Sequence, residues 1–418
     1  MDIIKNNLKV SLEYAKAFIK WLIIALAVGT VGGIVGSFFH LSVDVVTKCR
    51  EENTWIIYLL PVGGLFIAGL YHLCKRFGRL DTNRVLEAVK TEEKVPLVMA
   101  PLIFVSTVIT HLLGGSAGRE GAALQLGGSI GCNVGKIFKL NKKDLHIVVM
   151  TGMSAVFSAL FGTPLTAAVF SLEVTSVGVK YYAGLMPCVF AAIVSSRIAL
   201  AFGLHPVCFD FVKTIEITPL IITKVIILAI LCALVSILFC ALIKKCEHYM
   251  EKFIPNAYLR AVIGAGLIIG LTLAVGTYDY NGTGMDIITK AMEGHAKPEA
   301  FLLKIIFTAI TISSGFKGGE IVPAFFVGST FGCTIGSLLG LDPGIGTAVG
   351  FVSLFCGAVN CPLASAFLAL EVFGAESVLI FTLACSISYM LSGRFGLYSS
   401  QKIVYSKIED KFVNDCVK

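Results

Sequence analysis

Residues 114–132 read GGSAGREGAALQLGGSIGC, and the rest of the chain is organised around this stretch. Arg119 and Glu120 are its charged residues, and the apolar runs on both sides lead us to expect both at membrane depth. A carboxylate at that depth is energetically expensive and by default marks an ion or proton path. The glycines permit an irregular backbone with free N–H groups, and a helix starting near Ala122 would present its positive end to an anion. The stretch therefore predicts a site for a small anion beside a group that takes up a proton.

The chain is too apolar for a soluble protein of its length. Of its 418 residues, 56% are hydrophobic and 15% are charged, a balance typical of membrane proteins. The first apolar run is too long for a signal peptide and lacks a small-residue cleavage site, so we interpret it as a retained helix. The sequence predicts an all-α polytopic membrane protein. Its main apolar runs, the last one shorter, are Trp21–His40, Trp55–Leu73, Val95–Leu113, Lys224–Leu242 and Val378–Leu391.

The net charge of +7 does not indicate a nucleic-acid-binding surface. Lys and Arg gather in short segments at 5–20, 75–84 and 136–143, which the positive-inside rule predicts for cytoplasmic segments. We therefore expect a multi-pass protein of the plasma membrane, in contact with its lipid, with both termini cytoplasmic.

The thirteen cysteines and seven histidines are dispersed along the chain. Neither a CxxC pair nor a Cys–His cluster occurs, so we predict no metal site, no disulfide and no cofactor. His111 lies just before the central stretch and is a candidate proton carrier, but we favour a packed or hydrogen-bonded histidine.

Two blocks of sequence occur twice, in the same order. Residues 118–120 align with residues 318–320, and both segments reach a Gly and a Cys soon afterwards. PLTAAVFSLEV, from Pro164, aligns with PLASAFLALEV, from Pro362. The second match pairs Glu173 with Glu371, and we expect both to hydrogen-bond to loop backbone rather than to act in transport.

The duplication predicts two homologous membrane repeats, residues 1–205 and 215–418, without a soluble regulatory domain. Gly- and Pro-interrupted segments too short to cross a bilayer cleanly are typical of transporters with inverted repeats and a midplane site. Whether the halves are inverted or parallel depends on the number of crossings in each half, and we favour the inverted arrangement. The interrupted segments are Gly152–Gly162, Thr163–Val174, Glu320–Gly332 and Pro362–Phe373.

Several of these motifs together resemble the CLC family of chloride channels and anion/proton antiporters. The sequence GREG at 118–121 is similar to the family's central motif, and GGEIVP at 318–323 is similar to its second anion-binding loop. GLY at 396–398 resembles the family's C-terminal tyrosine motif, and 164–174 resembles a further family block. The resemblance extends over nearly the whole chain and implies a CLC-like fold of broken and tilted helices.

The resemblance also implies the site. Glu120 would be the gate, whose carboxylate competes with the anion and takes a proton when displaced. Tyr398 would offer its hydroxyl to a central anion, while the Arg119 side chain is expected to be structural. The implied anion-binding positions are Gly118, Arg119, Gly121, Gly319, Ile321, Val322 and Tyr398.

The chain departs from the chloride-transporting pattern in three places. The family's first anion loop, Gly-Ser-Gly-Ile-Pro, is missing, and the region reads GRLDTNRVLEA from Gly78. Val174 stands where chloride/proton antiporters carry an internal proton-relay glutamate. Glu320 places a carboxylate inside the second anion loop. The candidates that would replace the missing anion-coordinating serine are Asp81, Thr82 and Asn83.

These departures resemble the bacterial branch that exchanges fluoride for protons. Glu320 would then be a second coupling carboxylate beside Glu120, and its alignment with Glu120 favours that role over helix capping. The sequence therefore predicts a homodimeric proton-coupled antiporter that exports fluoride. The alternatives are a chloride/proton antiporter and a passive anion channel, which Val174 permits. Motifs of a membrane-embedded enzyme are missing, so we do not expect an enzyme.

Overall fold

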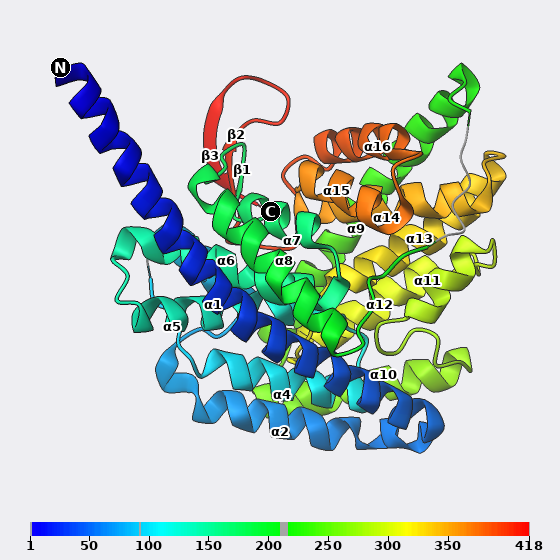
Figure 1. Ribbon diagram of the computed structural model, residues 1–418. Coiled ribbons are helices and arrows are strands. Elements are labelled where there is room, and N and C mark those ends of the chain that lie inside the picture. Colours follow the sequence, from blue (N-terminus) through cyan, green and yellow to red (C-terminus); the bar gives the residue numbers. More distant parts are fainter. Residues whose placement is uncertain (1, 92, 210–215, 418) are drawn as a thin grey trace.

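The computed structural model describes residues 2–91, 93–209 and 216–417, and these fold almost entirely into helices (Figure 1). Residue 215, the predicted start of the second repeat, and the chain ends at 1 and 418 lie outside the described residues. The first eight α-helices are α1 (Asp2–Glu52), α2 (Leu60–Leu73), α3 (Thr82–Thr91), α4 (Met99–Leu112), α5 (Glu120–Ile137), α6 (Lys142–Phe161), α7 (Pro164–Glu173) and α8 (Leu185–Ala201). The remaining α-helices are α9 (Pro219–Phe253), α10 (Ala257–Val275), α11 (Met285–Met292), α12 (Ala300–Ser313), α13 (Ile321–Leu338), α14 (Pro343–Val359), α15 (Pro362–Phe373) and α16 (Val378–Leu391). Short 3₁₀ turns occupy Thr54–Leu59, Lys75–Phe77 and Tyr182–Gly184.

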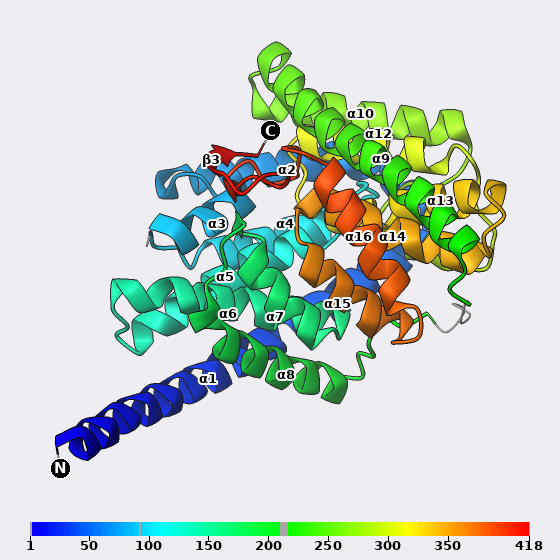
Figure 2. The ribbon, with the colours of Figure 1, turned by 90° about the horizontal axis from the view of Figure 1, so that it is seen from above.

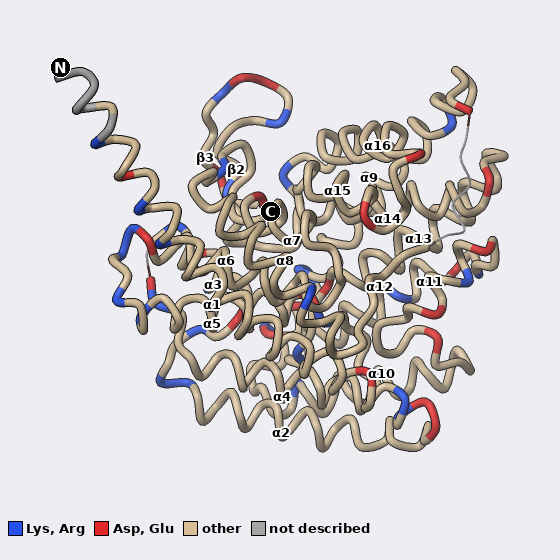
Figure 3. The backbone as a smooth tube through the Cα atoms, viewed as in Figure 1, with Lys and Arg blue, Asp and Glu red and all other residues tan. Residues whose placement is uncertain are grey.

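Seven helical segments of the described chain are long and apolar enough to cross a membrane, and the predicted polytopic helical fold is confirmed. Charged residues gather toward helix ends and loops, although a few lie inside the fold (Figure 3). The start of α1 extends away from the rest of the molecule in both ribbon views (Figures 1 and 2). The candidate spans are Lys9–Glu52, Thr54–Leu73, Lys142–Phe161, Tyr182–Ala201, Pro219–Phe253, Ala257–Val275 and Ile321–Leu338.

Two of the four segments predicted to be interrupted are continuous. Gly152–Gly162 belongs largely to α6, which has 20 residues, and Glu320–Gly332 belongs largely to α13, which has 18 residues. Their glycines mark helix crossings rather than breaks. A Cβ at Gly152 would lie 2.1 Å from the carbonyl oxygen of Gly127, so the backbones of α5 and α6 touch there, as small residues allow between membrane helices.

The other two segments do form short helices. Pro164 and Pro362 each occupy the start of a helix, where the missing proline N–H removes no hydrogen bond. The resulting helices, α7 and α15, have 10 and 12 residues, and they lie side by side (Figure 2).

The helix starts correct the register of the predicted repeat by one residue. Helix α5 begins at Glu120 after Arg119, whereas α13 begins at Ile321 after Glu320. The glycine crossings agree with this shift. A Cβ at Gly350 would lie 2.1 Å from the carbonyl oxygen of Gly328, just as a Cβ at Gly152 would lie 2.1 Å from that of Gly127, so Gly328 of α13 corresponds to Gly127 of α5. Glu320 therefore corresponds to Arg119, and its alignment with Glu120 was wrong.

Glu173 and Glu371 cap each other's repeat. Oε1 and Oε2 of Glu371, near the end of α15, accept hydrogen bonds of 2.9 Å from the N–H groups of Leu165 and Thr166 at the start of α7. Reciprocally, Glu173 Oε2, at the end of α7, accepts a hydrogen bond of 2.9 Å from the N–H of Ala364 in α15. Each carboxylate satisfies the free donors of the other helix and faces its positive end. The predicted hydrogen bonding to backbone is confirmed, but the donors lie at helix starts rather than in loops.

Replacing Glu371 by Ala should therefore destabilise the contact between α7 and α15. The loss of a charged acceptor for two N–H groups and the Thr166 hydroxyl should cost about 1–3 kcal/mol. A lower melting temperature of the detergent-solubilised protein would report it. Glu409→Ala, at an exposed position between β2 and β3, is the control and should melt like the wild type; equal melting of both variants would contradict the prediction.

The end of the chain forms a small sheet that the sequence analysis did not predict. Strand β1 (Ser176–Val177) pairs parallel with β2 (Lys402–Tyr405), and β2 pairs antiparallel with β3 (Phe412–Cys416). The strands are too short for a periodic signal. Strand β1 follows α7 and pairs with β2, so it fixes the segment just after Tyr398.

Candidate functional site

The two glycine-rich loops meet in a short antiparallel bridge. Gly118 N–H donates to Gly319 O at 2.6 Å, and Gly319 N–H donates to Gly118 O at 2.7 Å. The bridge brings the first turns of α5 and α13 together, and a Cβ at Gly121 would lie 3.0 Å from the Gly319 Cα. Because the N–H groups of Gly118 and Gly319 each donate to the carbonyl oxygen of the other residue, we leave both out of the proposed anion-binding groups.

His111 supports this bridge. Its ring is fully buried, and Nε2 lies 3.3 Å from the Gly118 carbonyl oxygen, to which it donates when it carries the proton. The prediction of a packed, hydrogen-bonded histidine is confirmed.

The Glu120 carboxylate is buried among backbone N–H groups. Its Oε2 accepts a hydrogen bond of 2.9 Å from the Arg119 N–H, and the Val322 N–H also faces the carboxylate. The side chain folds back so far that a Cβ at Gly118 would lie 2.5 Å from Oε2. Oε1 is buried without a hydrogen-bond partner among the described residues. A negative group is thus held by amides of two helix starts, an arrangement that suits an anion.

The start of helix α13 has two free donors, because Pro323 removes one of the N–H groups that a helix start leaves unpaired. Proline has no N–H, and the N–H of Ala324 already donates to the Glu320 carbonyl at 3.0 Å. The N–H groups of Ile321 and Val322 are therefore the donors at this helix start that have no partner in the ladder. Both residues are buried, and both were predicted anion-binding positions.

Tyr398 and Glu320 are two further polar residues near the gate. The Tyr398 hydroxyl is buried without a hydrogen-bond partner in the described part of the chain, within electrostatic range of Glu120 and Glu320. Glu320 is partly exposed and precedes α13, but its side chain makes no capping hydrogen bond. Its charged neighbours are Glu247, Lys317 and Asp81.

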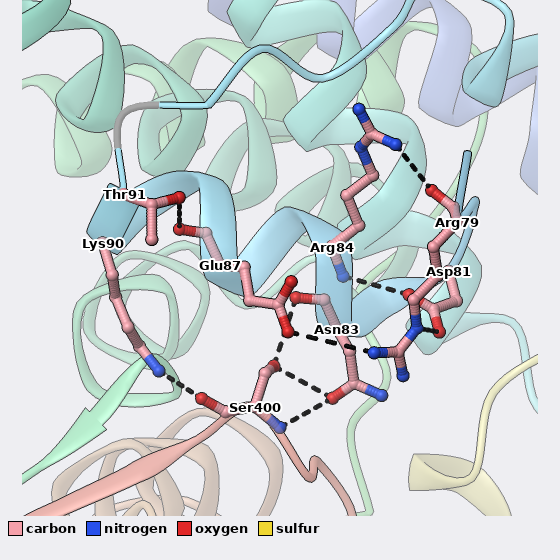
Figure 4. Close-up of polar contacts among 8 residues, drawn as sticks. All are labelled: Arg79, Asp81, Asn83, Arg84, Glu87, Lys90, Thr91 and Ser400. Atoms are coloured by element: carbon pink, nitrogen blue, oxygen red, sulfur yellow. Dashed lines mark hydrogen bonds and ion pairs between the residues drawn. The ribbon is translucent and has the colours of Figure 1, made fainter. Parts of the chain in front are cut away.

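The three candidates of the first loop separate into three roles, and the contacts of Asp81 and Asn83 are drawn in Figure 4. Asp81 Oδ1 accepts from the Arg84 N–H at 3.0 Å and so begins α3. Asn83 Oδ1 accepts from the Ser400 N–H at 3.0 Å, which fixes the chain two residues after Tyr398. Thr82 alone of the three lies against the start of α5, because its Oγ1 accepts from Gln125 Nε2 at 3.0 Å. Among these candidates we retain Thr82 for the anion path.

Arg119 faces away from the bridge, toward the end of α1. Its Nη1 donates to Asp44 Oδ1 at 2.9 Å, and Asp44 Oδ2 lies 3.2 Å from His40 Nε2. A cavity of about 460 Å³ is lined by Asp44 and Arg119 among others. Sequence analysis missed Asp44 and His40. Two ionisable residues four positions apart, at the end of an apolar helix, were the signal that marked them.

Comparison with known proteins identifies the family of the chain. A family profile described as "Voltage gated chloride channel" matches residues 63–393. The chain is 35% identical over 395 residues to a "Chloride/fluoride channel protein" of Pseudomonas syringae pv. tomato, covering 93% of this chain and 87% of that protein. It is 26% identical to the "H(+)/Cl(-) exchange transporter ClcA" of Yersinia pestis, covering 84% of this chain and 79% of that protein.

Solved structures match as well. The crystal structure of a CLC-type fluoride/proton antiporter superposes with a TM-score of 0.89 at 31% identity, covering 92% of this chain and 98% of that one. A slow cyanobacterial Cl⁻/H⁺ antiporter superposes with a TM-score of 0.74 at 19% identity, covering 89% of this chain and 94% of that one, and shows the fold alone. The resemblance drawn from the motifs is confirmed. The chain belongs to the voltage gated chloride channel family, also known as the CLC family.

Proposed function

We propose that this protein is a proton-coupled antiporter that exports a small halide, fluoride by preference, along a path gated by Glu120. One observation carries the proposal: the buried Glu120 carboxylate occupies a position lined by the N–H groups of Arg119 and Val322. An anion and a charged carboxylate compete for such a position. Protonation of Glu120 removes its charge and favours the anion, so anion binding and proton uptake are coupled.

The preference for fluoride rests on two supports. The chain is 31–35% identical to proteins described as a fluoride/proton antiporter and a chloride/fluoride channel protein. In addition, the serine loop of chloride transporters is replaced by a helix start at which Thr82 faces α5. Because the chain belongs to a family of channels and transporters, it is a transport protein and not an enzyme.

Proteoliposomes loaded with equal fluoride and chloride test the preference. We expect fluoride efflux, read with a fluoride electrode, to exceed chloride efflux by about tenfold or more, which corresponds to ~1.4 kcal/mol in barrier height. Protein-free liposomes provide the background rate for each ion. A chloride flux equal to or above the fluoride flux would contradict the preference and leave a chloride/proton antiporter.

A passive channel is the second candidate, and Val174 permits it. This residue is fully buried, and its carbonyl accepts a hydrogen bond of 3.0 Å from Gln401 Nε2, so the internal proton-relay position holds an apolar side chain. A downhill anion gradient should drive protons uphill through an antiporter but not through a channel. Measuring external pH under an imposed fluoride gradient separates the two.

We also propose a homodimer in the plasma membrane with cytoplasmic termini. The side chain of Lys20 pairs with Asp144, which joins the basic start of α1 to the basic loop before α6. Both clusters then lie on one side, as the positive-inside rule expects for the cytoplasm. Cross-linking in membranes addresses the dimer, and labelling of single introduced cysteines from either side addresses the orientation.

A further inference from the structure

A line of ionisable side chains runs from α1 to the gate. His40 Nε2 lies 3.2 Å from Asp44 Oδ2, Asp44 Oδ1 lies 2.9 Å from Arg119 Nη1, and Arg119 Nε lies 3.9 Å from Glu120 Oε1. The side chains of Arg119 and Glu120 are 14% and 1% exposed, whereas that of Asp44 is 44% exposed to the cavity. The Arg119 guanidinium therefore has two carboxylates within reach.

Asp44 makes the closer contact. A charge-assisted hydrogen bond of 2.9 Å is much stronger than a contact at 3.9 Å, which is too long for a hydrogen bond. His40 fixes the second oxygen of Asp44, so that Oδ1 stays directed at Arg119. Glu120 Oε1, meanwhile, is buried without a hydrogen-bond partner among the described residues. A guanidinium released by Asp44 would have that oxygen within reach, since Nε already lies 3.9 Å from it.

We propose that Asp44 is a positioning residue that holds the Arg119 guanidinium off the Glu120 carboxylate, so that the carboxylate can accept a proton. The proposal rests on the gating role proposed above for Glu120. Without Asp44, an ion pair between Arg119 and Glu120 would stabilise the charged carboxylate, because an opposite charge at contact distance favours ionisation. Stronger acid would then be needed to protonate the gate.

Other charges near the site do not replace this contact. Tyr398 is the further titratable group within electrostatic range of Glu120, and the His111 ring contacts the bridge at Gly118. The cavity beside Asp44 carries three basic and three acidic side chains besides Asp44 and Arg119, so their charges balance. These six are Lys48, Arg50, Glu51, Asp279, Asp286 and Lys290.

The pH dependence of fluoride-driven proton flux in proteoliposomes tests the proposal. For Asp44→Asn we expect the rate profile to move by about one pH unit toward acid, the smaller end of the effect of a neighbouring opposite charge. The rate at neutral pH should fall about tenfold. Asp286→Asn removes the same charge from the same cavity without touching Arg119 and should keep the wild-type profile. Asp44→Glu keeps a carboxylate at this position, so its rate profile should lie close to that of the wild type.

A double-mutant cycle separates positioning from a general field effect, because deleting a nearby negative charge would itself favour ionised Glu120. In an Arg119→Gln background, Asp44→Asn should cause no further shift. An equal shift in both backgrounds, or an unshifted Asp44→Asn profile, overturns the proposal. If Asp44→Asn does not insert into the membrane, the rate profile of Asp44→Glu is compared with that of the wild type. A displacement of that profile that persists in the Arg119→Gln background overturns the proposal. A wild-type protein without fluoride-driven proton flux would instead overturn the proposed function.

Discussion

Replacing Glu120 by Gln is expected to slow both fluoride and proton exchange by at least about 100-fold, the loss typical when a positioned proton-transfer group is removed. Glutamine has nearly the shape of glutamate but neither binds a proton nor carries a charge. It therefore cannot return to the amide-lined position beside Arg119 and Val322 as a charged group, so the alternation between charged occupant and protonated bystander that couples the two fluxes stops. Paired fluoride-electrode and pH-electrode traces from proteoliposomes measure both fluxes.

The control is Glu52→Gln, the same chemical change at an exposed position at the end of α1, which should exchange at the wild-type rate. Rapid fluoride movement without protons in Glu120→Gln would contradict the prediction. It would indicate that neutralising the gate opens the path, as expected for a channel whose carboxylate merely blocks it.

The helical membrane fold could be predicted because apolar runs of membrane-spanning length leave little choice. The interior backbone of a bilayer protein must satisfy its own hydrogen bonds, and helices do so locally. The fate of the glycines was harder to predict. Gly152 can mark either a break or a close helix crossing, and the choice depends on whether a neighbouring backbone, here at Gly127, approaches it.

The register of the repeat shows how a chemical match can mislead. Aligning Glu120 with Glu320 pairs two identical residues. The glycines of α5 and α13 that contact neighbouring helices instead match at a spacing that is one residue longer. That spacing was visible in the sequence, because Gly127, Gly131 and Cys132 match Gly328, Gly332 and Cys333. Crossing glycines report backbone contacts and are therefore better markers of register than a pair of acidic residues in adjoining loops.

The site itself could be predicted as two loops but not as a set of contacts. Asp81, Thr82 and Asn83 are equivalent as polar residues in sequence, and tertiary partners separate them: Asp81 bonds to Arg84, Asn83 to Ser400 and Thr82 to Gln125. Asp44 was missed because its partner Arg119 lies 75 residues away, and no local pattern joins them.

Glu320→Ala should abolish proton movement or uncouple it from fluoride, and the structure makes this a sharp test of the second coupling carboxylate. Glu320 is surrounded by Glu247, Lys317 and Asp81, whereas Glu120 adjoins Arg119, which contacts Asp44. The two glutamates therefore face different polar surroundings, as two proton stations on one path would. Tyr398 is within electrostatic range of both, and its buried hydroxyl makes no hydrogen bond among the described residues, so we propose it as a donor to an anion passing between them.

A structural role for Glu320 predicts a different result. An N-cap residue contributes about 1 kcal/mol through its side-chain hydrogen bond, but Glu320 precedes α13 without making one. The melting temperature of Glu320→Ala in detergent should therefore stay near that of the wild type and of Glu293→Ala, an exposed control at the end of α11. Loss of proton flux at unchanged stability, with partial recovery in Glu320→Asp, would assign the effect to the carboxylate. An unchanged ratio of protons to fluoride in Glu320→Ala would indicate that Glu320 has a structural role and that Glu120 is the single coupling group.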